Sequence, residues 1–255
     1  ETGTYTIQVY DSGHDAAGTY TIDLQGINPS SLDALPIQLG ETKSGTIAVT
    51  GEVDSHIFTA ASDDVVTLTV AKTDASPYRP YADLYTPTGD LVRTVWSGSK
   101  EVCTLPETGT YTIQVYDSGH DAAGDYTIDL QGVNPLSLDA LSLICSETHS
   151  GSVALGEVDE YRLYGEINDV VTLAVGNTDA YPYRPYADLY TSTGNLVGTV
   201  WSGTAQQYTL PVTGPYVIQV YDSGHDAGGN YNFTLQWTSP LKGCIAGQKF
   251  NDLDA

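Results

Sequence analysis

The residues best suited to chemistry lie in a nine-residue stretch, YDSGHDAAG, at residues 10–18. It recurs at residues 116–124 and, with one change, as YDSGHDAGG at residues 221–229. Ser, His and Asp are the side chains of a nucleophilic triad, in which the histidine contacts both the nucleophile and an orienting carboxylate. Side chains one to three positions apart on a short loop rarely reach that geometry, and no Gly-x-Ser-x-Gly elbow surrounds the serine. We therefore interpret the stretch as a turn and expect no enzyme in this chain.

The sequences on either side of this turn are typical of β-strands. TYTIQVYD at residues 110–117 and DYTIDLQG at residues 125–132 alternate with a period of two, as half-buried strands do. VVTLTV at residues 65–70 is β-branched and apolar, and turn signals such as PTGD at residues 87–90 separate the segments. No segment has helical apolar spacing. The pattern predicts an all-β fold of tandem jelly-roll β-sandwiches, each of about 100 residues.

The chain is an internal repeat whose period matches a whole small domain. Equivalent turns begin at Tyr10, Tyr116 and Tyr221, so the period is 106 and then 105 residues. Residues 1–29 and 107–135 differ at two positions. We expect the last part of one repeat at residues 1–36, full repeats at 37–138 and 139–240, and a tail at 241–255 that starts a further module. Periodicity leaves open a shifted frame of 1–106 and 107–211.

The partial repeat at the N-terminus supplies two strands without the rest of their sandwich. A lone hairpin is barely stable in water, and exposed strand edges seek partners. Either the missing part precedes the sequence given, or the hairpin adds to a neighbouring chain or domain, which would build a filament.

Charge excludes some partners and suggests others. The chain has 9 Lys+Arg against 32 Asp+Glu and a net charge of −23. We expect no nucleic-acid binding, which needs clustered cations, and no membrane insertion, because no apolar run of about 18 residues occurs. Carboxylate oxygens suit calcium, so the recurring acidic pairs are candidate ligands, and the alternative is a solvated acidic surface. The candidates are Glu52, Asp54, Asp117 and Asp121, with Glu157, Asp159, Asp222 and Asp226 in the next repeat.

A second candidate site is the segment PYRPYADLY, which occurs in both full repeats. On a rigid proline-rich loop, Tyr and Arg are good contact residues for a sugar or protein partner. The alternative is that the rings pack over one end of the sandwich. The candidates are Tyr78, Arg79 and Tyr81 with Tyr183, Arg184 and Tyr186. We expect Trp96 and Trp201, at strand ends, to close a core rather than to bind sugar.

The three cysteines permit two interpretations. Cys103 and Cys145 occupy positions where a neighbouring repeat has an apolar residue, which favours small buried hydrophobic side chains. The alternative is a Cys145–Cys244 disulfide in an oxidising compartment, which would link the start of the last repeat to the tail.

Residues 105–131, LPETGTYTIQVYDSGHDAAGDYTIDLQ, and the pattern over residues 64–92 resemble the bacterial pre-peptidase C-terminal domain. That family includes the collagen-binding modules of clostridial collagenases. The resemblance implies a secreted, non-catalytic jelly roll, and some members bind calcium, collagen or other insoluble polymers. The tail, GQKFNDLDA at residues 247–255, is similar to the opening of B-type repeats of bacterial surface adhesins. This second resemblance implies that Asn251, Asp252 and Asp254 begin a calcium loop.

Two functions fit these observations. The first is a structural or adhesive protein, secreted or at the cell surface, whose tandem sandwiches self-associate as parts of a surface layer, stalk or fibre. The alternative is an accessory region that binds an extracellular polymer or polysaccharide for a secreted protease or other hydrolase.

Overall fold

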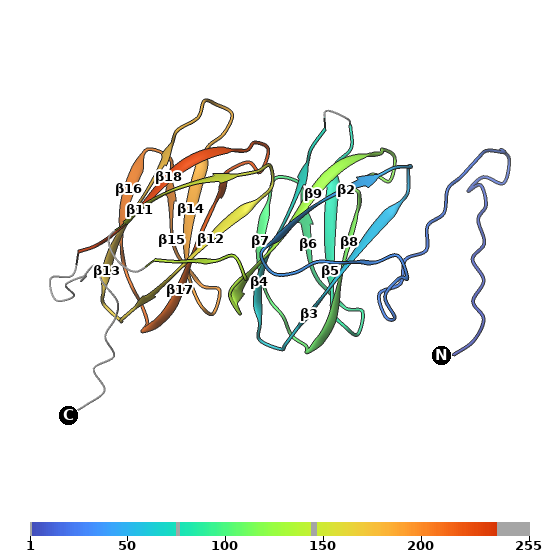
Figure 1. Ribbon diagram of the computed structural model, residues 1–255. Helices are drawn as coiled ribbons and strands as arrows, with labels where there is room; N and C mark the ends of the chain where they lie inside the picture. Colours follow the sequence, from blue (N-terminus) through green and yellow to red (C-terminus); the bar gives the residue numbers. More distant parts are fainter. Residues whose placement is uncertain (1, 75–76, 144–146, 239–255) are drawn as a thin grey trace.

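Two β-sandwiches stand side by side along the chain, and an extended N-terminal segment precedes them (Figure 1). The computed structural model describes residues 2–74, 77–143 and 147–238. We call residues 35–138 the first module, residues 141–238 the second module and residues 2–34 the N-terminal segment. Within the part of the chain that is described, no helix of membrane-spanning length and hydrophobicity occurs.

The described residues of each module form nine strands in the same order. The first module contains β1 (Leu35–Pro36), β2 (Glu41–Ile47), β3 (Val53–Ala60), β4 (Val65–Lys72), β5 (Pro80–Tyr85), β6 (Leu91–Trp96), β7 (Lys100–Thr104), β8 (Gly109–Asp117) and β9 (Gly124–Asn134). The second contains β10 (Leu141–Ser142), β11 (Glu147–Val153), β12 (Val158–Gly165), β13 (Val170–Asn177), β14 (Pro185–Thr191), β15 (Leu196–Trp201), β16 (Thr204–Thr209), β17 (Gly214–Asp222) and β18 (Gly229–Trp237).

The strand orders are those of a jelly roll, so the predicted fold class is confirmed. One sheet of the first module runs β1-β3-β8-β5-β6 and the other runs β2-β9-β4-β7; the second module repeats this as β10-β12-β17-β14-β15 and β11-β18-β13-β16. The long strands pair antiparallel, for example Val53 with Tyr116 and Ala60 with Gly109 between β3 and β8. The short β1 and β10 add in parallel at the edge of a sheet.

Alternating apolar residues fill one core in each module. In the first, Val66 and Leu68 of β4 face Tyr111 and Ile113 of β8, and all four are buried. Equivalent residues form the core of the second module. Cys103 lies buried in the first core as a free thiol, which confirms its interpretation as a small hydrophobic side chain. Cys145 and Cys244 lie outside the described residues, as does the tail.

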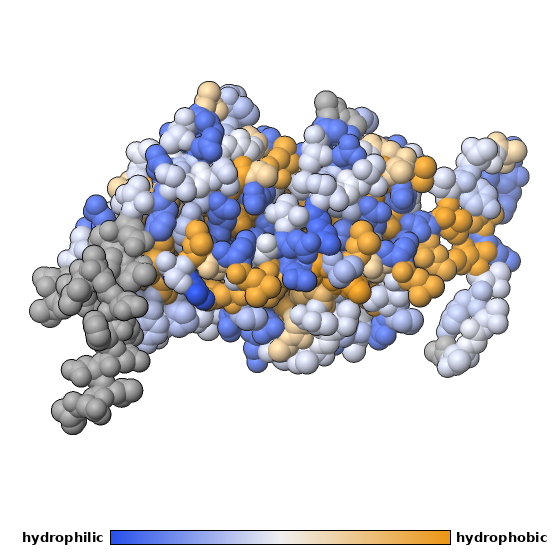
Figure 2. Space-filling model, in the orientation of Figure 1, coloured by the Kyte–Doolittle hydropathy of each residue, from blue (hydrophilic) through white to orange (hydrophobic). Residues whose placement is uncertain are grey.

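The N-terminal segment exposes side chains that its repeated counterpart buries. Tyr5 is 76% exposed, whereas its equivalent Tyr111 is fully buried. Apolar surface is visible over this end of the molecule in Figure 2. None of the described strand pairings joins the segment to the first module. Strand addition to another chain therefore stays a prediction.

Candidate functional site: the surface between modules

The repeated YDSGHD stretch forms the turn between the last two strands of each module. The Asp117 carboxylate accepts hydrogen bonds from the backbone N–H groups of Arg79 (2.8 Å), Gly119 (3.2 Å) and Asp121 (3.1 Å). These donors outweigh the effect of burial and lower the pKa of Asp117. His120 has a left-handed φ of 52° and stacks on Tyr116 at 5.0 Å between ring centroids. The turn interpretation is confirmed.

The second copy of the turn is built in the same way. Asp222 accepts from the backbone N–H groups of Arg184 (2.7 Å) and Asp226 (3.2 Å), and His225 stacks on Tyr221 at 5.1 Å. The aspartates proposed as calcium ligands in the turns, Asp117 and Asp222, thus have structural acceptor roles.

The acidic candidates outside the turns also accept internal hydrogen bonds. Glu52 accepts from the backbone N–H groups of Ala48 (2.6 Å) and Val49 (3.0 Å), and Glu157 accepts from that of Ala154 (2.5 Å). Asp54 and Asp159 accept from the Tyr126 and Tyr231 hydroxyls, at 2.7 and 2.5 Å. Burial raises the pKa of Asp159 to about 6. Among the described residues, no three His, Cys, Asp or Glu side chains gather as a metal site, and calcium stays a prediction.

The PYRPYADLY segments divide between core and surface. Tyr78 and Tyr183 are fully or almost fully buried, as the packing interpretation expects. Arg79 and Arg184 are exposed, and Tyr81 and Tyr186 are half-buried. The expectation for the tryptophans was wrong: Trp96 is 51% exposed and Trp201 is 47% exposed. Each ends an edge strand, β6 or β15, and its side chain does not enter the core.

A buried ion pair that the sequence patterns did not predict lies between the modules. The outer face of sheet β2-β9-β4-β7 packs on the outer face of sheet β10-β12-β17-β14-β15. Seven consecutive residues of β4 are buried, whereas the equivalent strand β13 alternates. We call the first surface the lysine face and the second the aspartate face. The lysine face includes Thr67, Thr69, Lys100, Val102, Asp129, Gln131 and Val133; the aspartate face includes Glu160, Asp188, Tyr190, Val217, Gln219 and Tyr221.

Lys100 is the central contact. Its Nζ lies 2.7 Å from Asp188 Oδ2, and both side chains are 6% exposed. The ammonium also lies 3.8 Å from the ring centroid of Tyr221 and 5.1 Å from that of Tyr190, which adds cation–π attraction. Burial lowers the pKa of Lys100, and Asp188 partly offsets this.

Hydroxyl groups of the second module orient the Asp188 carboxylate toward this cation. Its carboxylate accepts from the hydroxyls of Tyr190 (3.0 Å), Thr199 (2.6 Å) and Tyr221 (2.9 Å), as well as from Lys100. Burial raises the pKa of Asp188, but Lys100 and these hydroxyls outweigh that effect and lower it. The carboxylate is therefore held in its charged form against the lysine.

A polar network extends from this ion pair. Gln219 Nε2 donates to Thr67 Oγ1 and to Glu160 Oε1, each at 2.8 Å. Burial raises the pKa of Glu160 to about 7, and its Oε2 has no hydrogen-bond partner among the described residues. On the lysine face, Asp129 Oδ2 accepts from the backbone N–H of Val158 at 3.1 Å, and burial raises the pKa of Asp129 as well.

An apolar cluster and a turn complete the interface. Val65 and Val133 of the lysine face pack with Tyr190 and Val217 of the aspartate face. The turn before β7 covers the second YDSGHD turn, where His225 is 3% exposed although His120 of the first turn is exposed. Burial lowers the pKa of His225 to about 4.

The N-terminal segment repeats two of these contacts with the first module. Asp23 Oδ2 accepts from the backbone N–H of Val53 at 2.8 Å, as Asp129 does from Val158. Thr21 Oγ1 donates to the carbonyl of Thr50 at 2.5 Å, as Thr127 Oγ1 does to that of Leu155 at 2.9 Å. These are equivalent positions of the repeat, so two contacts of the lysine face recur at both junctions.

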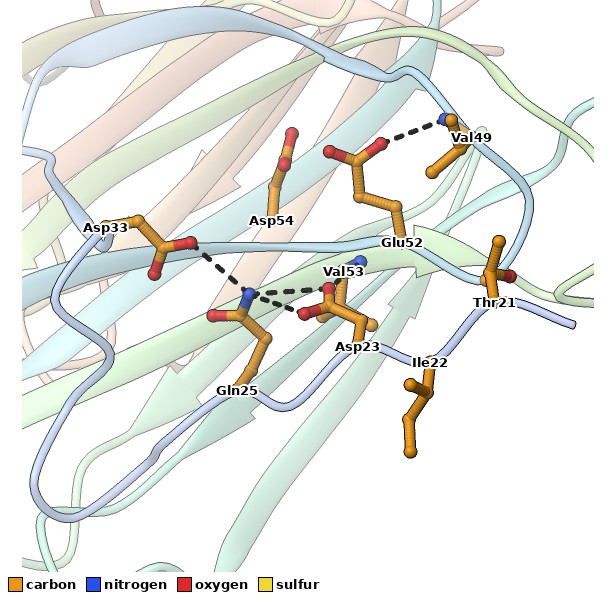
Figure 3. Close-up of a pocket in the computed structure, with 10 residues that line it drawn as sticks. Thr21, Ile22, Asp23, Gln25, Asp33, Val49, Glu52, Val53 and Asp54 are labelled. Carbon is orange, nitrogen blue, oxygen red and sulfur yellow. Dashed lines mark hydrogen bonds between the residues drawn. The ribbon is translucent and has the colours of Figure 1, made fainter. Parts of the chain in front are cut away.

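An acidic hollow of about 240 Å³, open to solvent, lies at this first junction (Figure 3). Its lining brings together Asp23 and Asp33 of the N-terminal segment with Glu52 and Asp54 of the first module. Gln25 Nε2 donates to Asp23 Oδ1 at 3.1 Å and to Asp33 Oδ2 at 3.5 Å. Burial raises the pKa of Asp54. Two of the predicted acidic ligands therefore lie at a junction between repeats.

Comparison with known proteins finds distant structural similarity alone. No protein-family model matches the chain, and no curated protein is significantly similar in sequence. Among solved structures, the chain is similar to the periplasmic g-type lysozyme inhibitor PliG of Aeromonas hydrophila, with 15% identity over 38% of this chain and 95% of that chain and a TM-score of 0.33. It is also similar to the CUB1-EGF-CUB2 region of human MASP-1/3, with 12% identity over 76% and 99% and a TM-score of 0.21.

A third similar structure is the pair of tandem CBM51 modules of a family 98 glycoside hydrolase from Streptococcus pneumoniae. Identity is 8% over 74% of this chain and 82% of that chain, with a TM-score of 0.25. These values assign no family and no activity. The resemblances to the pre-peptidase C-terminal domain and to adhesin B-type repeats stay predictions from the sequence.

Proposed function

We propose that this chain is a non-catalytic structural segment of a secreted or cell-surface protein, in which β-sandwich modules stack into a stiff stalk, fibre or surface layer. The observation that carries the proposal is the repetition of one junction. The N-terminal segment contacts the first module through Thr21 and Asp23, the equivalents of two side chains by which the first module contacts the second. An interface that recurs in register adds units in one direction without changing its contacts.

The chemistry of the junction supports stiffness rather than flexible linkage. A flexible tandem array needs polar linkers and small contacts between domains. Here the two facing sheets meet through an ion pair, a hydrogen-bonded network and an apolar cluster. Separating the partners of the ion pair or of the network would leave buried polar groups unsatisfied, which opposes bending at the junction.

The test combines scattering by the chain with electron microscopy of the native material. We expect the small-angle X-ray scattering profile to fit two modules in the fixed arrangement of Figure 1, and the native material to form rods or layers. A profile that requires freely moving modules would overturn the proposal.

The alternative function, a polymer-binding accessory region, is favoured by exposed Trp96 and Trp201 beside half-buried Tyr81 and Tyr186. It predicts dispersed particles that bind insoluble polysaccharide. That outcome in the same native material would replace the structural proposal.

A further inference from the structure

The first module carries a second copy of the lysine-binding site. Asp83 accepts hydrogen bonds from the hydroxyls of Thr94 (2.5 Å), Tyr116 (2.9 Å) and Tyr85 (3.3 Å). These residues are the repeat equivalents of Thr199, Tyr221 and Tyr190 around Asp188. The carboxylate and the two flanking rings that hold the Lys100 ammonium in the second module are thus present in the first.

This copy is not filled by a cation from the described part of the chain. The ion pairs there involve Lys43, Arg93 and Lys100, and none of them involves Asp83. Tyr85 is half-buried, whereas Tyr190 is buried, and Gln114 is half-buried, whereas Gln219 is fully buried. The surface around Asp83 is therefore less covered than the surface around Asp188.

The N-terminal segment indicates which element covers this surface. Thr21, Asp23 and Gln25 occupy the places of Thr127, Asp129 and Gln131, which belong to β9. In the first module β9 pairs with β4, and β4 pairs with β7, the strand that begins at Lys100. Equivalents of β4 and β7 beside the N-terminal segment would place a lysine over Asp83.

We propose that Asp83, Tyr85 and Tyr116 bind the ammonium group of a lysine on another copy of this repeat, stacked on the first module through its lysine face. The inference rests on the proposed function and adds its partner: a β-sandwich with a lysine at the start of its seventh strand. A primary ammonium suits the site because it satisfies the carboxylate and lies on the faces of both rings.

The second module of another copy of this chain does not fit this role. At the position of Lys100 it has Ala205, and at those of Val102 and Asp129 it has Gln207 and Thr234. The face that would dock therefore lacks the cation, the apolar contact and the carboxylate. The partner must carry the lysine-face sequence of the first module, so end-to-end self-association of this chain is not the expected contact.

The test extends the full chain at its N-terminus with a copy of residues 31–106, because residues 1–30 then supply the last strands of a complete module. A Ser99→Thr change in the added copy distinguishes its peptide by mass. Amines are labelled with acetic anhydride and quantified by mass spectrometry. We expect the added lysine to react as slowly as Lys100, and both to react more than about tenfold more slowly than Lys43, since buried amines are labelled only after opening.

The matched control changes Asp83→Asn in the original first module of the extended chain and leaves the added copy unchanged. Lys100, which pairs with Asp188, is the internal reference. We expect faster labelling of the added lysine and no change at Lys100. Fast labelling of the added lysine in the unmutated extended chain, or an unchanged rate after Asp83→Asn, would overturn the inference. Scattering by the same sample separates the two proposals: a stacked third module with a reactive lysine removes the site alone, whereas an unstacked one counts against the proposed function.

Discussion

The aspartate face of the second module and the equivalent face of the first module share most of their residues but have different surroundings. Asp188 lies beneath a neighbouring sheet with a lysine 2.7 Å away, while Asp83 keeps the same three hydroxyl donors and lacks a described cation partner. His225 is buried and His120 is exposed. The difference arises from what is stacked on each face, and not from the architecture of the site itself.

This comparison indicates that each module carries a ready-made surface for the module before it. Hydroxyl groups orient the carboxylate within one module, so little reorganisation is needed when an ammonium arrives. The faces differ mainly beside the site, where Glu160 and Val217 of the second module replace Ser55 and Thr112 of the first. The predictions below test how far the covered face depends on its neighbour.

The largest effect is expected from Lys100→Met. The change removes the cation but leaves Asp188 buried, and an unpaired buried charge costs about 3–5 kcal/mol. We expect a loss of this order in the free energy of unfolding of the second module, measured by denaturant titration with hydrogen exchange at β14 and β17.

Lys43→Met is the matched control for that change. Lys43 lies 3.3 Å from Glu41 at a more exposed position, and pairs of this kind contribute less than about 1 kcal/mol. Equal losses for the two variants would mean that the buried pair does not stabilise the junction.

The second prediction concerns pH and Glu160, whose counterpart in the first module is Ser55. Burial raises the pKa of Glu160 from 4.5 to about 7, so the folded state favours the protonated form. Its stabilising contribution is full below pH 4.5 and is lost as pH rises toward 7, a change of at most about 3 kcal/mol. Glu160→Gln keeps an acceptor for Gln219 and should flatten this part of the stability profile, followed by thermal unfolding between pH 4.5 and 8.

Two other titratable residues, Asp129 and His225, also change the pH dependence of stability. The pKa of Asp129 is also raised by burial, so the slope should decrease without vanishing. His225, with its pKa lowered to about 4, acts in the opposite sense and loses stability as pH falls from 6.5. An unchanged profile after Glu160→Gln would show that Glu160 does not titrate in this window.

Period-two patterns predicted the strands and the jelly roll because they record which residues face a module's own core. The repeated turn was predictable for a similar reason, since Asp and Gly have local backbone roles. The junction was missed because its residues point away from that core, and the charged and amide side chains among them are indistinguishable from solvated ones. A usable signal was the difference between nearly identical repeats: Lys100 against Ala205, Val102 against Gln207 and Asp129 against Thr234.

The smallest effect should separate two glycines in equivalent turns. Gly194 has a φ of +77°, and a Cβ there would lie 2.8 Å from Val65 Cγ1 of the first module. Gly89 has a φ of +99°, and a Cβ there would meet none of the described atoms within 4 Å. Alanine strains the backbone at both positions by about 1–2 kcal/mol, so that cost cancels in the comparison.

The two variants then differ in stability only by the steric clash of the Gly194→Ala Cβ with the neighbouring module. We expect Gly194→Ala to lower the free energy of unfolding by about 1 kcal/mol more than Gly89→Ala does, as overpacking against a buried valine should. When both glycine variants are measured in a Val65→Ala background, relative to Val65→Ala alone, most of this excess should disappear. Val65→Ala deletes the methyl group that the new Cβ meets. If the two glycine variants lose the same stability, the stacked sheets are not in close contact at this edge, and the difference between the two faces is confined to the ion pair and its network.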